Sequence, residues 1–251
     1  GFGIEGMIKI FNLKYLFTFI FLASSVAALE TEISFESIYD HASEKLIVDG
    51  VSTSYSLGSA GIRVDWKTDQ NLLFHASFGM GYFPNYKMSA FGTNFSGPVE
   101  GSMKNIGGQY RLYKAEDHKL NVSFEILERD VNGNDFRGVR NGQSLKVKST
   151  AAFELSDFSL GYEYFLSRSL SLGFNAGITS WKFDASGLTL LNNMTISKKV
   201  TESGQSPKVQ FYANVGSKKP VEIFLTRRAY SVDNLVETYE LMVRFPLYSF
   251  K

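Results

Sequence analysis

The segment Leu120-Asn-Val-Ser-Phe-Glu-Ile-Leu-Glu-Arg129 decides the fold class, because apolar and polar residues alternate along it. In an extended chain, one face would carry the apolar side chains of Leu120, Val122, Phe124 and Ile126. The opposite face would carry the polar side chains of Asn121, Ser123 and Glu125. A repeat of two residues predicts a β-strand with an apolar and a polar environment, because an amphipathic helix would repeat every ~3.6 residues.

The same alternation recurs along most of the chain. In 170–181, Leu, Phe, Ala and Ile alternate with Ser, Gly, Asn and Thr. We predict ten strands, with eight as the alternative number, and the first of them is the weakest. They are centred on 31–39, 62–66, 72–80, 106–112, 120–126, 158–164, 170–178, 209–215, 221–225 and 239–245.

The connections between these segments alternate between short and long. The short ones are 68–71, 115–119, 167–169 and 217–220. The long ones are 40–54, 84–101, 130–149 and 184–207, and a final shorter link lies near 231–236. Tight turns at one end, long loops at the other and an even strand number are typical of a closed antiparallel up-and-down transmembrane β-barrel, which is the all-β fold that we predict.

One irregularity falls in the segment 151–158, where the alternation changes phase between Leu155 and Phe158. We expect a β-bulge at this point. The alternative is that the strand begins only at Phe158.

The first residues have the pattern of a secretory signal peptide. A basic region after Met7 precedes the apolar run 15–23, and the small residues 24–28 follow directly. The apolar run is too short to cross a bilayer as a helix. We therefore expect cleavage after Ala27 or Ala28.

This cleavage would divide the chain into a leader and one domain. The leader is 1–28, of which 1–6 precede the expected native start, and the single barrel domain is 29–251. After residue 28, no segment approaches the ~18 consecutive apolar residues of a transmembrane helix. A membrane location would therefore depend on the strands.

Composition excludes several classes of function. The 26 basic and 25 acidic residues are spread along the chain, which argues against a nucleic-acid-binding surface. The absence of cysteine excludes disulfides, thiolate metal sites and cysteine nucleophiles. The 3 histidines are scattered, so we expect neither a histidine-based metal site nor a cofactor.

A soluble, exported, lipocalin-like barrel is the structural alternative, because alternation alone does not say which face points inward. The polar face contains many small residues, such as Gly107, Gly173 and Ser171, which suit a crowded interior. The apolar face carries aromatic residues near strand ends, such as Trp66 and Tyr110, as membrane interfaces do. These features favour the membrane barrel.

In these features, and in the C-terminal strand 238–250, the chain resembles the small outer-membrane β-barrel proteins of Gram-negative bacteria. The resemblance implies a monomer in the outer membrane, in contact with lipid and lipopolysaccharide. It also implies that the barrel-insertion machinery reads the terminal aromatic residue, here Phe250. Lys251 and Pro246 depart from the pattern. Either the paired part of the strand stops near Phe245, or Pro246 sits at a bulge near the periplasmic rim.

The face predicted to point inward carries charges of both signs. They are Arg63, Asp65, His75, Arg111, Glu125, Arg129, Glu163, Glu222, Glu240 and Arg244. Because buried charges need partners, we predict a network that plugs the lumen of a barrel with a structural or surface-interaction role. The alternative is a narrow porin-like channel whose ion preference these charges set.

An enzyme is the third hypothesis. His75 and Ser77 would share a strand face, and a tight turn would place Asp65 opposite His75, which is the arrangement of an activated serine. The His-x-Ser motif is similar to that of outer-membrane lipid A deacylases, but there it lies near the C-terminus and faces lipid. We therefore predict no catalytic residues.

Proteases of the omptin kind also have ten strands, and they need paired acids and a His-Asp couple at the extracellular rim. This chain offers only Asp40-His41, Asp130 and Asp135, without the required spacing.

Two of the predicted long loops carry residues suited to surface contact. The second loop carries Tyr86, Phe91 and Phe95, and the fourth carries Lys198 and Lys199. These loop residues would either cap the barrel and touch headgroups, or bind a partner or lipopolysaccharide.

Overall fold

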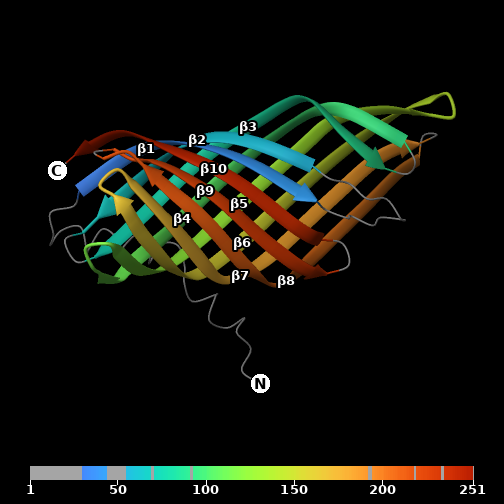
Figure 1. Cartoon of the computed structure of the whole chain (residues 1–251). Helices are drawn as coiled ribbons and strands as arrows, with labels where there is room; N and C mark the ends of the chain where they lie inside the picture. Colours follow the sequence, from blue (N-terminus) through green and yellow to red (C-terminus); the bar gives the residue numbers. More distant parts are fainter. Residues whose placement is uncertain are drawn as a thin grey trace, which may run out of the picture.

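Ten antiparallel strands close into a barrel in the computed structural model, as the sequence predicts (Figure 1). The strands are β1 (Glu30–Ser43), β2 (Tyr55–Lys67), β3 (Leu72–Ala90), β4 (Thr93–Lys114), β5 (His118–Arg140), β6 (Gln143–Ser167), β7 (Leu170–Leu191), β8 (Met194–Val215), β9 (Val221–Val232) and β10 (Leu235–Phe250). Each strand pairs with its neighbours in sequence, and β10 pairs with β1. The structure describes residues 30–43, 55–68, 71–90, 93–191, 194–217, 219–232 and 235–250. The predicted leader 1–28 lies outside these ranges.

No helix in the described residues has the length and apolarity needed to span a bilayer.

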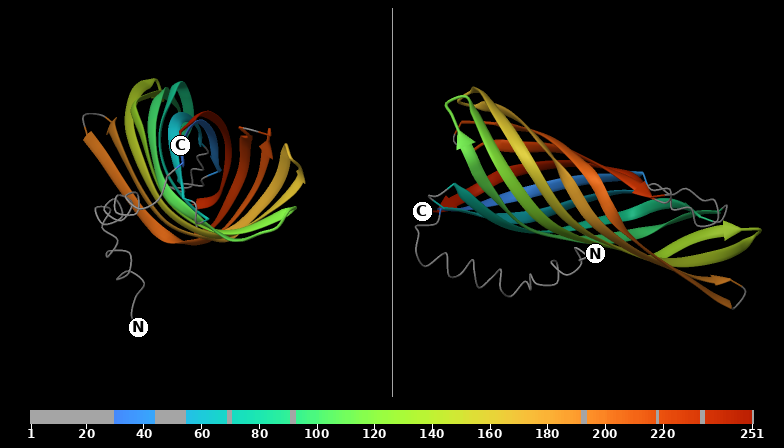
Figure 2. Two further views of the ribbon diagram at one scale, coloured as in Figure 1. Left: turned by 90° about the vertical axis from the view of Figure 1, so that its left-hand side faces the viewer. Right: turned by 90° about the horizontal axis from the view of Figure 1, so that it is seen from below.

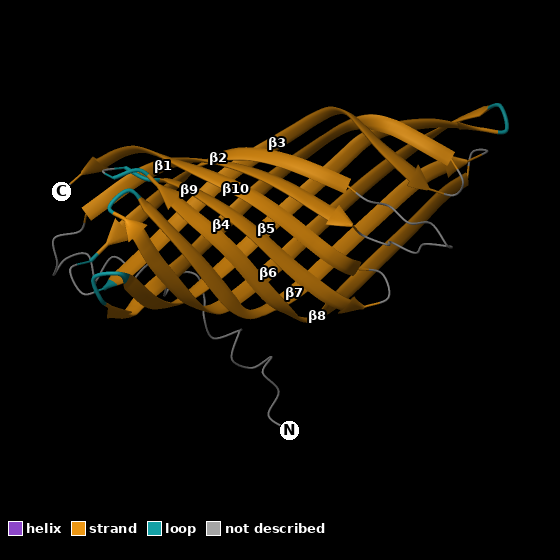
Figure 3. Ribbon diagram, viewed as in Figure 1, coloured by secondary structure: helices purple, strands orange, loops and turns teal. Residues whose placement is uncertain are grey.

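Three of the predicted long loops are strands. The ranges 84–101, 130–149 and 184–207 belong almost entirely to paired hairpins, and β5 and β6 reach 23 and 25 residues (Figure 3). The tip between β5 and β6 is Asn141-Gly142, both with positive φ, as a two-residue hairpin turn requires. The prediction was wrong because these segments alternate poorly, which is expected of a sheet that leaves the membrane. Of the predicted loop 40–54, residues 44–54 lie outside the described part.

The unequal strand lengths give the barrel an extension. β3 to β8 continue past the last β2–β3 pair, Ala60↔Met80, and the last β8–β9 pair, Lys208↔Arg228. We call this part the extension; it lies at the end opposite the C-terminus (Figures 1 and 2). The end where β1 begins, β10 ends and the short turns lie is the periplasmic end of such barrels, so the extension is extracellular.

The two faces of the barrel wall differ as a membrane barrel requires. Phe158 and Ile178, which face outward, are 59% and 56% exposed, whereas the inward-facing Asp157 and Thr179 are 3% and 0% exposed. The apolar outer belt ends at a row of outward charged residues, where Lys104 lies 3.6 Å from Glu128 and Lys182 lies 3.7 Å from Glu154. A β-sheet can cross lipid only as a closed barrel, because every backbone group must be paired. The buried polar face is the interior and the exposed apolar face is the outside, which excludes the soluble alternative.

The predicted bulge between Leu155 and Phe158 is absent. The β5–β6 register runs without a shift from His118↔Tyr164 to Gly133↔Ser149. Leu155 is buried inside the barrel and Phe158 is outside. The alternation changes phase because the interior itself becomes apolar at this level, and the backbone continues unchanged.

Pro246 sits at a bulge near the periplasmic rim, which was one of the two predicted possibilities. Its register partner is Ser34, the next pair is Ile33↔Tyr248, and the pairing continues to Thr31↔Phe250. The other possibility, that pairing stops near Phe245, is wrong. Lys251 lies outside the described residues.

Gly107 allows close packing inside the barrel, and this can be tested. A Cβ atom at Gly107 would lie 2.5 Å from the His75 ring and 2.6 Å from the carbonyl oxygen of Phe124. We expect Gly107→Ala to lower the free energy of unfolding by about 1–3 kcal/mol through overpacking. In Gly108→Ala the nearest atom would be 3.4 Å away, on the outer face, so this control should change stability much less. Urea unfolding in lipid vesicles measures both; equal losses would contradict the account.

Candidate functional site: the barrel interior

One ion pair joins opposite walls of the barrel. The guanidinium of Arg129 on β5 donates a hydrogen bond to the carboxylate of Glu240 on β10. In a ring in which each strand pairs with its sequence neighbours, β5 and β10 are the most distant strands. This contact therefore crosses the lumen. Arg228 of β9 approaches the same carboxylate oxygen to 3.6 Å.

Asp157 forms a second centre of buried charge. Its Oδ2 atom accepts hydrogen bonds from Lys208 Nζ at 2.6 Å and Arg228 at 2.7 Å. Its Oδ1 atom accepts one from the Thr179 hydroxyl at 2.5 Å. Lys208 Nζ also lies 3.3 Å from Glu125. The bonds connect β6 with β7, β8 and β9, and Lys208 extends the connection to β5.

A third group of charges lies nearer the periplasmic end. Arg63 holds the Asp65 carboxylate through three hydrogen bonds of 2.9, 3.0 and 2.7 Å. Arg244 donates to Glu36 at 2.9 Å and also binds Glu222. Arg63 lies 3.7 Å from Glu36, which links the two arginines. These contacts follow neighbouring strands and do not cross the lumen.

The structure brings nine of the ten residues predicted for the interior network into these contacts or beside them. Glu163 binds Lys119 at 2.6 Å and accepts from Ser171, and His75 Nε2 lies 3.5 Å from Glu125. Arg111 is the exception, because its guanidinium donates to Asn71 at 3.1 Å beside a periplasmic turn.

Sequence reasoning missed several partners of these residues. They are Glu36, Lys119, Asp157, Lys208 and Arg228. Asp157 fell in the expected bulge, and Lys208 and Arg228 lie just outside the predicted strands. Continuing the alternation by two or three residues past each predicted strand would have found the last two.

An apolar layer crosses the same part of the lumen. It consists of side chains from β1, β4, β5, β6, β7 and β10 that are each at most 9% exposed and in mutual contact. Its members are Ile38, Met103, Leu127, Phe153, Leu155, Trp181, Phe183 and Met242. Leu127 lies between Glu125 and Arg129 along β5, so the apolar layer and the ion pairs alternate along the wall.

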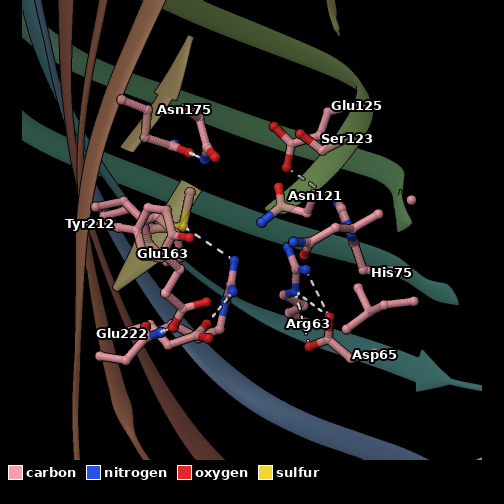
Figure 4. A pocket seen from close by; sticks show the side chains of 18 of the residues that line it. Arg63, Asp65, His75, Asn121, Ser123, Glu125, Glu163, Asn175, Tyr212 and Glu222 are labelled. Atoms are coloured by element: carbon pink, nitrogen blue, oxygen red, sulfur yellow. Dashed lines mark hydrogen bonds and ion pairs between the residues drawn. The ribbon is translucent and has the colours of Figure 1, made fainter. Parts of the chain in front are cut away.

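A polar cavity of about 130 Å³ occupies the periplasmic half of the lumen (Figure 4). Its lining carries both signs of charge and several amides, including Arg63, Glu125, Asn175, Glu163, Lys208 and Arg244. Figure 4 shows Arg63 with Asp65 on one side, and Tyr212 and Glu222 on another. Met242 of the apolar layer also lines this cavity.

The interior does not assemble the activated serine that the sequence suggested as a possibility. Asp65 and His75 are register partners, as expected from the tight turn, and Ser77 follows on the same face. The Asp65 carboxylate, however, is held by Arg63, and the nearest carboxylate to His75 in an ion-pair geometry is Glu125. His75 and Ser77 are buried inside the wall and do not face lipid.

The acids considered for protease chemistry are not brought together at the rim. Asp130 is exposed, and Asp135 binds Arg137 at 2.9 Å and Lys146 at 3.0 Å. The backbones of Asp40 and His41 pair with Glu240 and Tyr239 of β10. In the described residues, the extension therefore offers an ion-pair cluster and no paired acids.

The Asp135 cluster predicts a pH response. Hydrogen bonds from Arg137 and then Lys146 lower the pKa of Asp135 to about 2. Because this pKa is lowered in the folded state, the carboxylate stabilises the fold fully above its pKa in the unfolded chain, near 3.9. That stabilisation is lost as the pH falls through about 2. We expect the Asp135 carboxyl carbon to titrate near pH 2 by NMR, and at higher pH in Arg137→Ala. A wild-type midpoint near 4 would show that the cluster does not form.

The aromatic residues predicted for the second loop pack within the extension. Phe95 is 2% exposed in a cluster with Val99, Phe136, Leu145 and Val147, and the ring of Tyr86 lies 6.2 Å from that of Phe136. Phe91 lies outside the described residues. The backbone of Lys198 and the exposed Lys199 lie on β8.

Comparisons with known proteins agree with this geometry. No protein-family model and no curated protein sequence matches the chain. Among solved structures, the outer membrane protease OmpT from Escherichia coli matches with a TM-score of 0.56 and 8% identity, over 87% of this chain and 96% of that chain. The translocator domain of the autotransporter NalP from Neisseria meningitidis matches with a TM-score of 0.52 and 9% identity, over 93% and 94%. At this identity the likeness concerns the fold alone. With its apolar outer belt and polar interior, the chain has the fold of the bacterial outer-membrane β-barrels, as the sequence predicts.

Proposed function

We propose that this protein is a non-conducting, non-enzymatic outer-membrane barrel whose closed interior supports an extracellular sheet used for surface contact. The observation that carries the proposal is the Arg129–Glu240 ion pair between opposite walls. The apolar layer at the same level supports it. An ion crossing this level would have to shed water against apolar side chains and compete with charges that are already paired.

The proposal includes the route by which the barrel reaches the membrane. The leader 1–28 would be removed on export, and the C-terminal strand would be read during insertion. The barrel would then stand as a monomer, with lipid against the apolar belt and lipopolysaccharide near the charged row of Lys104 and Lys182. The Arg129–Glu240 pair and its charged neighbours would serve to close the lumen.

A narrow channel is the second candidate, and the periplasmic cavity favours it. A polar space of about 130 Å³ holds water readily, because a single water needs roughly 10–15 Å³ of such space. The charges lining this space balance, which would give little preference for cations or anions. Met242 lines the cavity and belongs to the apolar layer, which indicates that the cavity ends at this layer and does not continue through the lumen.

Single-channel recording in planar bilayers tests the proposal. Wild-type protein whose insertion has been confirmed by heat-modifiable migration should give no current steps in molar salt. Regular steps from that preparation would favour the channel. Hydrolysis of lipid or peptide substrates that disappears in His75→Ala would favour an enzyme.

A further inference from the structure

The β8 strand has an open edge along the extension. It pairs with β7 from Leu191↔Met194 to Leu170↔Val215 without a register shift. On its other side, β9 pairs with it only from Lys208↔Arg228 onward, as far as the described residues show. In Figure 2 the β7–β8 hairpin projects past β9. We call residues 194–206 the β8 edge.

The backbone groups that point toward this open side can be identified. The N–H of Gly216, the residue directly after β8, donates to Ser169 O at 2.8 Å, so the even-numbered positions face β7. In an antiparallel strand, successive residues direct their N–H and C=O groups to opposite neighbours. Because the β7–β8 ladder has no shift, the odd-numbered residues face the open side. Pro207 agrees with this assignment. It has no N–H, but as an odd-numbered residue it does not need one to pair with β7, and the β7–β8 ladder continues through it. The edge residues are Thr195, Ser197, Lys199, Thr201, Ser203 and Gln205.

The opposite edge of the extension is protected. β3 contains Pro84, and its register with β4 shifts between Phe83 and Tyr86. Proline and bulges are devices that prevent pairing at exposed edges. Between Met194 and Ser206, β8 has neither proline nor a register shift. The two edges therefore differ, and only β8 presents a regular row of donors and acceptors.

We propose that the β8 edge binds an extended peptide segment of another protein by strand addition, with an acidic side chain of that segment opposite Lys199. The inference rests on the proposed function, because it names the site and the kind of partner for the surface contact. Main-chain hydrogen bonds would supply affinity, and cross-strand pairs would supply specificity. Lys199 is exposed, as is Lys148 on β6, the strand beyond β7, which favours an acidic segment.

A second copy of this chain in the same membrane does not fit the edge. Two such barrels are related by an axis along the membrane normal. Strands in these barrels tilt by about 35–45°, so two β8 edges would cross at roughly twice that angle and could not form a ladder. Within one membrane, the partner is therefore a different chain.

The probe is a fluorescein-labelled synthetic peptide with the sequence of residues 179–190 and the change Ser186→Glu. This segment of β7 already pairs with β8, and Ser186 is the register partner of Lys199. We expect the peptide to bind the full chain in lipid vesicles by fluorescence anisotropy. Thr201→Pro removes one edge N–H, and it should weaken binding by about tenfold or more. Thr201→Val, which keeps this N–H, should bind as wild type does.

Absence of binding to wild type, or equal binding to Thr201→Pro, would overturn the inference. If Thr201→Pro does not fold, amide exchange of wild type decides. Thr201 and Lys199 should exchange rapidly alone and slowly with peptide, whereas Val200 and Glu202 should be protected throughout. Rapid exchange of the Thr201 and Lys199 amides in the presence of saturating peptide would also overturn the inference. Current is recorded separately, so a conducting barrel would contradict the proposed function without changing the peptide result.

Discussion

Replacement of Asp157 by asparagine is expected to lower the free energy of unfolding of the barrel by about 3–5 kcal/mol. Asp157 is the shared acceptor for Lys208 and Arg228, whose side chains are 2% and 4% exposed. Without its charge, two cations would remain in a buried site with less compensation. Removing one member of a buried charged group costs more than the group contributes when intact, because the partners cannot recover their hydration.

A matched control lies on the same strand. Glu154 and Lys182 form a pair at 3.7 Å with side chains 62% and 46% exposed. We expect Glu154→Gln to change the unfolding free energy by less than about 1 kcal/mol. Urea unfolding in vesicles, followed by tryptophan fluorescence, measures both variants. Similar effects for Asp157→Asn and Glu154→Gln would mean that the interior charges are hydrated and that the lumen is open.

The double replacement Leu155→Ala and Trp181→Ala is expected to turn a silent barrel into a conducting one. The two residues are register partners on β6 and β7, and both belong to the apolar layer. Their loss would remove the largest side chain of the layer and admit water beside the remaining ion pairs. Planar-bilayer recording should then show discrete current steps that the wild type lacks.

The control has the same strands and a similar change in volume. Phe158 and Ile178 are register partners on the outer face, so Phe158→Ala with Ile178→Ala alters the contact with lipid and not the lumen. This double variant should stay silent. If the interior double variant were equally silent, the apolar layer would not be the barrier to ions.

The sequence predicts the membrane part of this fold well, and the physical reason is clear. Between about Phe158 and Tyr164, each successive residue meets lipid or the polar interior, so the pattern follows the backbone directly. Above the row of Lys182 and Glu154, lipid is absent and the outer face need not be apolar, although one face still buries apolar side chains such as Phe95. The alternation there is interrupted, and parts of six strands, joined in three hairpins, were therefore predicted to be loops.

The interior residues were predictable, but their pairing was not. A strand pattern tells which side of the wall a residue such as Glu240 occupies. It does not tell which residue reaches it from another strand, because barrel closure and register bring distant strands together. Arg129 and Glu240 are 111 positions apart in sequence. Leu155 misled the prediction for a related reason, since an apolar layer inside the barrel imitates a change of phase in the strand.

A double-mutant cycle at Arg129 and Glu240 tests the central claim most directly, because that claim is that opposite walls of the barrel meet. Arg129→Met, Glu240→Gln and the double variant would each be unfolded by urea in vesicles. We predict a coupling energy of about 1.5–3 kcal/mol, the range for hydrogen bonds to charged groups in mutual contact. A coupling energy near zero would contradict the account, because it would mean that β5 and β10 are separated by an open lumen.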